Sequence, residues 1–83
     1  MQDVIAEFIR TRFRAAIGAK PFDAHTSLFT SGIVDSFGVL ELIAFLEQQF
    51  GVDVDPARYE LSDFDTVEKI ERLVQQLVAG ART

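Results

Sequence analysis

The sequence predicts an all-α fold: a small antiparallel four-helix bundle with three longer helices and one short one. Three stretches repeat apolar residues every three to five positions, as amphipathic helices do. Only residues 52–55 alternate like a strand, and without a partner strand they do not form a sheet. The chain of 83 residues suffices for one domain, residues 1–83, with a long loop between helices 1 and 2.

The first helix is predicted over residues 2–17, with an apolar face opposite its arginines. Gly18 is a suitable stop, because glycine readily takes the left-handed conformation found at many helix ends. Residues 18–35 show no period and are rich in Gly, Pro, Thr and Ser, which predicts a loop. Loops of this length in small domains are often functional. The residues expected to anchor this loop to the core are Leu28, Phe29 and Ile33.

The second helix is predicted over residues 36–50, with Gly51 as its stop. A first set of apolar side chains falls on one stripe of this helix at about 100° per residue, and this stripe is the expected core face. It consists of Val39, Leu42, Ile43, Leu46 and Phe50.

Two further helices are indicated by their start signals. A short one is expected from Pro56 to about residue 60, because Asp55 can cap it and proline suits a first turn. The last helix is expected to begin with Asp65 as its N-cap, in a capping box that Glu68 completes. Its apolar residues recur at helical spacing until Gly80 ends it.

Composition excludes several classes of function. The net charge is −5, and residues 21–83 hold eleven acidic and four basic groups, so the chain would repel nucleic-acid phosphates. Cysteine is absent, which rules out disulfides, thiolate metal sites and a cysteine nucleophile. No apolar run approaches the roughly 20 residues that span a membrane, and we expect no secretory signal, because no basic stretch precedes an apolar one at the start. We expect a cytoplasmic monomer with no nucleic-acid or membrane partner.

The second helix carries more apolar surface than a single core face needs. Phe37, Leu40 and Ala44 form another stripe, interleaved with Glu41. One interpretation is a central helix that is buried on two sides. The other is a partly exposed apolar strip edged by carboxylates, which is typical of a protein-binding patch. The first-turn position of Phe37, beside the long loop, favours the exposed strip.

Asp35 and Ser36 open this helix, and taken alone such a pair indicates an N-cap. A phosphate on an exposed serine at this place would meet unpaired amides and the positive end of the helix dipole, so the position suits a phosphodiester. His25, the single histidine, is interpreted as a loop residue, and no base is placed to activate Ser36 as a nucleophile. Nor do the acids form a calcium loop, because Arg58 stands where Asp53-x-Asp55 would need glycine. We expect no metal site and no catalytic residues.

The segment around Ser36 also carries a family resemblance. Residues 29–37 read Phe-Thr-Ser-Gly-Ile-Val-Asp-Ser-Phe, residues 41–43 read Glu-Leu-Ile, and residues 46–51 read Leu-Glu-Gln-Gln-Phe-Gly. Residues 63–67 then read Asp-Phe-Asp-Thr-Val. This series resembles the acyl carrier proteins, in which a serine after an acid opens a helix that contains Glu-Leu and ends in Phe-Gly. The resemblance covers essentially the whole chain, including the helix order and the long first loop.

The resemblance implies that the protein is not an enzyme. A separate phosphopantetheinyl transferase would move 4′-phosphopantetheine from coenzyme A onto Ser36, with Asp35 in the same attachment site. The terminal thiol of that group would hold acyl or aminoacyl cargo as a thioester, loaded by an activating ligase and passed to downstream acyl-transferring enzymes. In the family, the helix after the serine is the main docking surface. The implied partner contacts are therefore Phe37, Leu40, Glu41, Ala44 and Glu47.

Several positions depart from the fatty-acid carriers. Phe37 stands where leucine is usual, and Gly38 stands where those carriers commonly have an acid or polar residue. The second helix has only Glu41 and Glu47 as acids, and the double glycine of many peptidyl carriers is missing. This form looks more like the discrete carriers that serve stand-alone adenylating ligases, whose cargo is an amino acid or a specialised acyl group.

A competing hypothesis from another class remains open. The chain could be a small helical interaction module that never receives phosphopantetheine and uses only the apolar strip. An enzyme is the poorest hypothesis, because the sequence offers no base, metal site or nucleotide loop.

Overall fold

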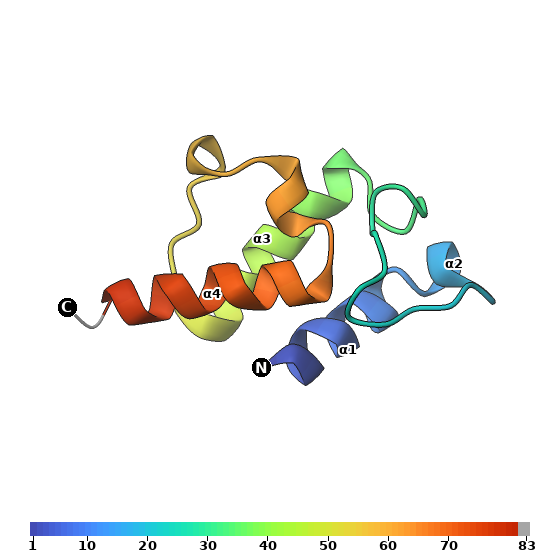
Figure 1. The fold of residues 1–83 in the computed structure, drawn as a ribbon, viewed down its shortest axis with the longest axis horizontal. Coiled ribbons are helices and arrows are strands. Elements are labelled where there is room, and N and C mark those ends of the chain that lie inside the picture. Colours follow the sequence, from blue (N-terminus) through green and yellow to red (C-terminus); the bar gives the residue numbers. More distant parts are fainter. Residues whose placement is uncertain (82–83) are drawn as a thin grey trace.

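Four α-helices and two short 3₁₀ turns make up the fold, in a computed structural model that describes residues 1–81. The last helix, α4, packs against α1, α3 and η2, while α2 and the loop after it lie at the opposite end of the long axis from the last turn of α4 (Figure 1). The described residues contain no strand, which confirms the all-α class. The elements in order are α1 (Gln2–Arg12), α2 (Arg14–Ile17), α3 (Ser36–Phe50), η1 (Pro56–Arg58), η2 (Leu61–Phe64) and α4 (Val67–Ala81).

The predicted first helix is interrupted, so the expectation of one helix over residues 2–17 is wrong. Phe13 separates α1 from α2 with φ −112° and ψ 28°. Its ring packs edge-to-face on Phe8, with the ring centroids 6.2 Å apart, and it also lies close to Gly38 of α3. The break therefore turns an aromatic side chain onto the neighbouring helix. Gly18 ends α2 with a positive φ of 53°, as predicted.

The bounds of α3 are those expected from the sequence. The Asp35 carboxylate accepts a hydrogen bond from the Gly38 amide at 2.8 Å, which caps the N-terminus. Gly51 takes the left-handed conformation with φ 65°, and its N–H donates to the Glu47 carbonyl. Both ends of α3 are thus set by local signals.

The short helix expected after Asp55 is a 3₁₀ turn that already ends at Arg58, earlier than predicted. The Asp55 carboxylate does cap it, accepting from the Ala57 amide at 3.0 Å. A second 3₁₀ turn, η2, was not predicted. Its own capping box includes a hydrogen bond from the Glu60 amide to the Asp63 carboxylate at 2.9 Å.

The N-cap of α4 is Thr66, so the assignment of Asp65 to that position is wrong. The Thr66 hydroxyl accepts from the Lys69 amide at 3.1 Å, and the helix begins at Val67. It ends at Ala81, one residue beyond the predicted end. The Asp65 carboxylate instead accepts hydrogen bonds from the Ser27 hydroxyl at 2.9 and 3.0 Å and from the Phe29 amide at 3.2 Å. This carboxylate therefore ties the long loop to the start of α4.

The core lies between α1, α3 and α4. Leu28 and Ile33 anchor the loop in it as expected, while Phe29 is only half-buried. Four residues of the predicted α3 face are buried, whereas Phe50 is half-buried at the edge. Within residues 1–81, no helix has the length and apolar content that crossing a bilayer requires. The fully buried large side chains are Ile5, Ile9, Leu28, Val34, Leu42, Leu46, Val67, Ile70 and Val74.

Candidate functional site

Ser36 is the first residue of α3, and its side chain is exposed. Within residues 1–81 its hydroxyl makes no hydrogen bond, because the capping role belongs to Asp35. The amides of Ser36 and Phe37 occupy the first two helical positions, where α-helix geometry provides no intrahelical acceptor. The hydroxyl therefore stands in solvent at the positive end of a helix of four turns.

The loop that leads to Ser36 is held in place by hydrogen bonds. The Lys20 ammonium donates to the Ser31 carbonyl at 2.9 Å, and the Val34 amide donates to the Leu28 carbonyl at 3.0 Å. Leu28 in turn donates its amide to the Asp65 carbonyl at 2.6 Å. The loop segment before Ser36 is thus fixed to the rest of the fold by hydrogen bonds.

The predicted apolar strip is on the surface. Phe37 is 76% exposed and Leu40 is 58% exposed, and Ala44 beside them is also exposed. These are the two most exposed large hydrophobic side chains among the described residues. The geometry therefore contradicts the interpretation that α3 is buried on both sides. We refer to Phe37, Leu40 and Ala44 as the apolar strip.

The two acids of α3 flank the apolar strip on opposite sides, and both have partners. The Glu41 carboxylate pairs with Arg12 of α1, with Nε 2.6 Å from Oε2 and Nη2 2.7 Å from Oε1. The Glu47 carboxylate accepts from the Val54 amide at 3.1 Å. Glu41 is therefore paired with a cation, whereas Glu47 meets a neutral donor and pairs with no cation among residues 1–81.

A groove beside the strip was not predicted. Phe8 of α1 and Phe45 of α3 stack with ring centroids 4.0 Å apart, and their rings line two adjoining hollows of about 610 and 300 Å³. Ala44 belongs both to the strip and to the smaller hollow. The sequence contained the aromatic residues, but their pairing across helices depends on the tertiary packing.

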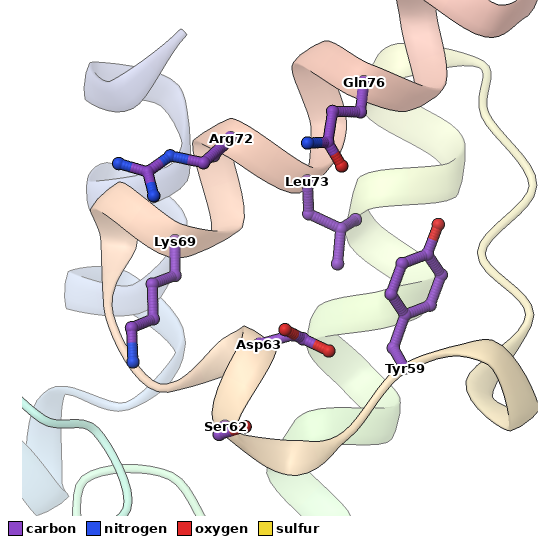
Figure 2. Close-up of a pocket in the computed structure, with 7 residues that line it drawn as sticks. All are labelled: Tyr59, Ser62, Asp63, Lys69, Arg72, Leu73 and Gln76. Carbon is purple, nitrogen blue, oxygen red and sulfur yellow. The ribbon is translucent and has the colours of Figure 1, made fainter.

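A different hollow of about 250 Å³ lies between η2 and α4 (Figure 2). Tyr59 stands on one side of it, and Lys69 and Arg72 stand on the other. Its acid, Asp63, accepts from the Glu60 amide within η2, and Arg72 pairs with Glu68 at 3.3 Å. None of the predicted site residues lines this hollow.

His25 is an exposed loop residue, as interpreted from the sequence. Its Nδ1 lies 2.9 Å from a Glu68 carboxylate oxygen at the start of α4. Its backbone N–H, donated to Asp23 at 2.8 Å, is the main cause that holds the pKa of the Asp23 carboxyl below its usual value. Across residues 1–81, the His, Asp and Glu side chains do not gather into any group of three that could hold a metal ion.

Comparison with known families shows the family to which the chain belongs. The family model for the phosphopantetheine attachment site matches residues 7–74, which is most of the chain. The chain belongs to this family. It is a carrier protein, and its prosthetic group is covalently attached 4′-phosphopantetheine.

Several curated relatives of this carrier are D-alanyl carrier proteins. The one from Lacticaseibacillus rhamnosus is 38% identical over 50 residues, which are 60% of this chain and 62% of the relative. That from Lactiplantibacillus plantarum, D-alanyl carrier protein 1, is 37% identical over 51 residues, 61% of this chain and 64% of the relative. That from Streptococcus pyogenes serotype M5 is 40% identical over 50 residues, 60% of this chain and 63% of the relative. The matched part of the carrier thus spans less than two thirds of each relative.

The start of α3 fits the prosthetic group. An ester of phosphate on the Ser36 oxygen would project into solvent, next to the amides of the first helical turn. The nearest acid, Asp35, already accepts the Gly38 amide, which lowers its repulsion of a phosphate. The exposed strip begins at the next residue, Phe37. An enzyme acting on Ser36 would therefore face the Ser36 hydroxyl and the strip together.

Proposed function

We propose that Ser36 is the attachment residue and that the carrier holds aminoacyl groups as thioesters and passes them between partner enzymes. The observation that supports Ser36 is its exposed, unengaged hydroxyl at the N-terminus of a long helix. The alternatives are less suitable. Ser27 donates its hydroxyl to Asp65, and Ser31 donates its hydroxyl to the Leu28 carbonyl at 3.3 Å. Ser62 is exposed but lies in the short 3₁₀ turn η2.

In the proposed modification, the Ser36 hydroxyl oxygen attacks the phosphorus next to the pantetheine part of coenzyme A. A new P–O bond forms at Oγ, the pyrophosphate bond breaks, and adenosine 3′,5′-bisphosphate leaves. The transferase takes the hydroxyl proton, because no side chain of the carrier accepts a hydrogen bond from the Ser36 hydroxyl within residues 1–81. The amides of the first turn of α3 stabilise the phosphodiester that results.

The bound group supplies a terminal thiol, which the cysteine-free chain lacks. We propose an amino acid as its cargo, because several curated relatives are named as D-alanyl carriers and because the segment around Ser36 resembles discrete carriers served by adenylating ligases. The ligase would activate the amino acid, and a downstream enzyme would accept it.

Partner enzymes are proposed to dock on the apolar strip and its flanking acids, Glu41 and Glu47. An exposed phenylalanine and leucine beside the attachment residue provide apolar area for a transient interface. Acids at the rim contribute mainly to the encounter rate with a basic partner surface. This arrangement lets one surface serve several enzymes in turn, because each enzyme must reach the same serine.

Intact-mass spectrometry tests the proposal. The protein without its prosthetic group is incubated with coenzyme A and a phosphopantetheinyl transferase of broad specificity. We expect one added group on the wild type and on Ser62→Ala, and none on Ser36→Ala, with all three proteins folded by circular dichroism. Modification of folded Ser36→Ala would contradict the assignment. A folded wild type that gains no mass would contradict the proposed attachment at Ser36.

A further inference from the structure

Gly38 is packed so closely that it leaves no space for a side chain. A β-carbon built at this position would lie 2.9 Å from Cε1 and 3.2 Å from Cζ of Phe13, and 3.0 Å from Cγ1 of Val34. Ordinary carbon–carbon contacts are about 3.5–4.0 Å, so a methyl group would force these neighbours to move. Its φ does not lie in the left-handed region, so steric contact rather than backbone conformation is what favours glycine here.

The Phe13 ring therefore rests directly on the backbone of the first turn of α3. Glycine in a helix is disfavoured relative to alanine, and the close approach of this ring is what the glycine permits. The same turn begins with Ser36, and it holds the Gly38 amide that Asp35 caps. The Val39 amide also bonds to the Asp35 carbonyl at 3.0 Å. The ring thus contacts the turn that carries the proposed attachment residue.

Phe13 is itself held firmly against α3. It packs edge-to-face on Phe8, which stacks on Phe45 of α3. Arg12, whose guanidinium lies 5.9 Å from the Phe13 ring centroid, is paired with Glu41 of α3. The break between α1 and α2 is what brings Phe13 to this place. The aromatic contact through Phe8 and the ion pair of the adjacent Arg12 therefore both hold the Phe13 ring near the first turn of α3.

We propose that the contact between Phe13 and Gly38 positions the first turn of α3 so that the Ser36 hydroxyl is presented in one orientation for transfer of the prosthetic group. Both are positioning residues, because neither side chain would touch the reacting atoms. The inference rests on the proposed function, in that Ser36 is taken as the acceptor. A group transfer is sensitive to small displacements of the acceptor atom, so a fixed turn accelerates the reaction.

The test measures kcat and KM of the same transferase with the unmodified carrier as the varied substrate. For Gly38→Ala we expect kcat to fall about tenfold, because the acceptor turn is displaced. We expect KM to change much less than kcat, because Leu40 and Ala44 of the apolar strip lie beyond the displaced turn. Gly80→Ala is the matched control, since a β-carbon at that helical glycine meets no atom of residues 1–81 within 4 Å. Both of its kinetic parameters should equal those of the wild type.

A compensating variant separates positioning from general damage to the fold. Phe13→Leu removes the ring atoms Cε1 and Cζ that a methyl group at position 38 would strike. In the Gly38→Ala/Phe13→Leu protein we expect kcat to recover in part, because the shorter contact is removed while the 3.0 Å contact with Cγ1 of Val34 remains. Hydrogen exchange gives a readout that does not depend on the reaction. The amides of Gly38 and Val39 should exchange faster in Gly38→Ala than in the wild type, and slowly again in the double variant.

The outcomes distinguish the two claims. A wild type that accepts no group contradicts the proposed function itself. A loaded wild type with Gly38→Ala at an equal kcat, or a double variant no better than Gly38→Ala, overturns the positioning role. If Gly38→Ala does not fold, Phe13→Leu alone provides the test, because it leaves a gap beside Gly38. It should lower kcat and speed exchange of the same amides, and unchanged values of both would overturn the inference.

Discussion

Arg12 at the end of α1 binds Glu41 of α3 through two contacts, Nε to Oε2 at 2.6 Å and Nη2 to Oε1 at 2.7 Å. The pair joins residues 29 positions apart and borders the apolar strip. Both side chains are about half exposed, so the pair contributes at most about 1 kcal/mol to the free energy of unfolding. Its larger consequence is electrostatic, because Glu41 is compensated whereas Glu47 on the other side of the strip is not.

The two acids should therefore differ in their effect on partner encounter. Glu47→Gln keeps an oxygen that can accept the Val54 amide, so its fold should be unchanged. We expect it to slow loading by the transferase about threefold at low ionic strength, with Glu41→Gln closer to the wild type. Added salt should bring the three rates together. Equal effects of the two variants at low salt would show that the Arg12 pair does not mask Glu41.

Exposure of the apolar strip predicts that Leu40→Ala lowers partner turnover without lowering stability. Leu46 is the matched control, because it is a leucine of the same helix that is fully buried. Leu46→Ala should cost about 2–5 kcal/mol of unfolding free energy, whereas Leu40→Ala should cost well under 1 kcal/mol. Chemical denaturation beside loading kinetics measures both effects. If Leu40→Ala lowered the unfolding free energy as much as Leu46→Ala, then Leu40 would be a core residue and the apolar strip would not be a surface for partners.

Loss of the Asp65 carboxylate should lower the free energy of unfolding through its contacts with the long loop, not through capping of α4. It accepts from the Ser27 hydroxyl and the Phe29 amide, so Asp65→Ala should cost about 1.5–3 kcal/mol and loosen the loop. Asp53→Ala, at an exposed acid with no hydrogen bond among residues 1–81, should stay within about 0.5 kcal/mol of the wild type. Urea unfolding of the two variants gives the comparison. Similar midpoints for both would mean that Asp65 does not hold the loop.

Asp35, not Ser36, caps α3, and the two residues should respond differently to alanine. Asp35→Ala removes the acceptor of the Gly38 amide and should cost about 1 kcal/mol. Ser36→Ala removes a hydroxyl that makes no hydrogen bond within the described part of the chain, so its melting temperature should match that of the wild type. A clear destabilisation by Ser36→Ala would indicate a structural role for the hydroxyl.

Local signals were enough to predict α3 and the place of Ser36. Asp35 and Gly51 mark its ends by side-chain capping and left-handed geometry, and both act within one turn of the helix. The first-turn position of Phe37 already favoured an exposed strip over a buried one. The start of a helix beside a loop is difficult to cover with other side chains. These features need no information from distant parts of the chain.

Long-range contacts explain the errors. Asp65 has the sequence signature of an N-cap, but its carboxylate is taken by Ser27, 38 residues away, and the adjacent Thr66 caps α4 instead. The break at Phe13 has no local breaker residue, and it reflects the packing of that ring against α3. The ion pair between Glu41 and Arg12 could not be predicted from the sequence either, because the two residues meet only when α1 and α3 pack together.

Tandem mass spectrometry of peptides from the loaded wild-type protein tests the central claim most directly. The protein is treated with coenzyme A and the transferase, digested, and the modified residue is located by fragmentation. We predict 4′-phosphopantetheine on Ser36 and on no other serine, because its hydroxyl is the exposed one at the start of a long helix. Location of the group on Ser27, Ser31 or Ser62 would contradict the account.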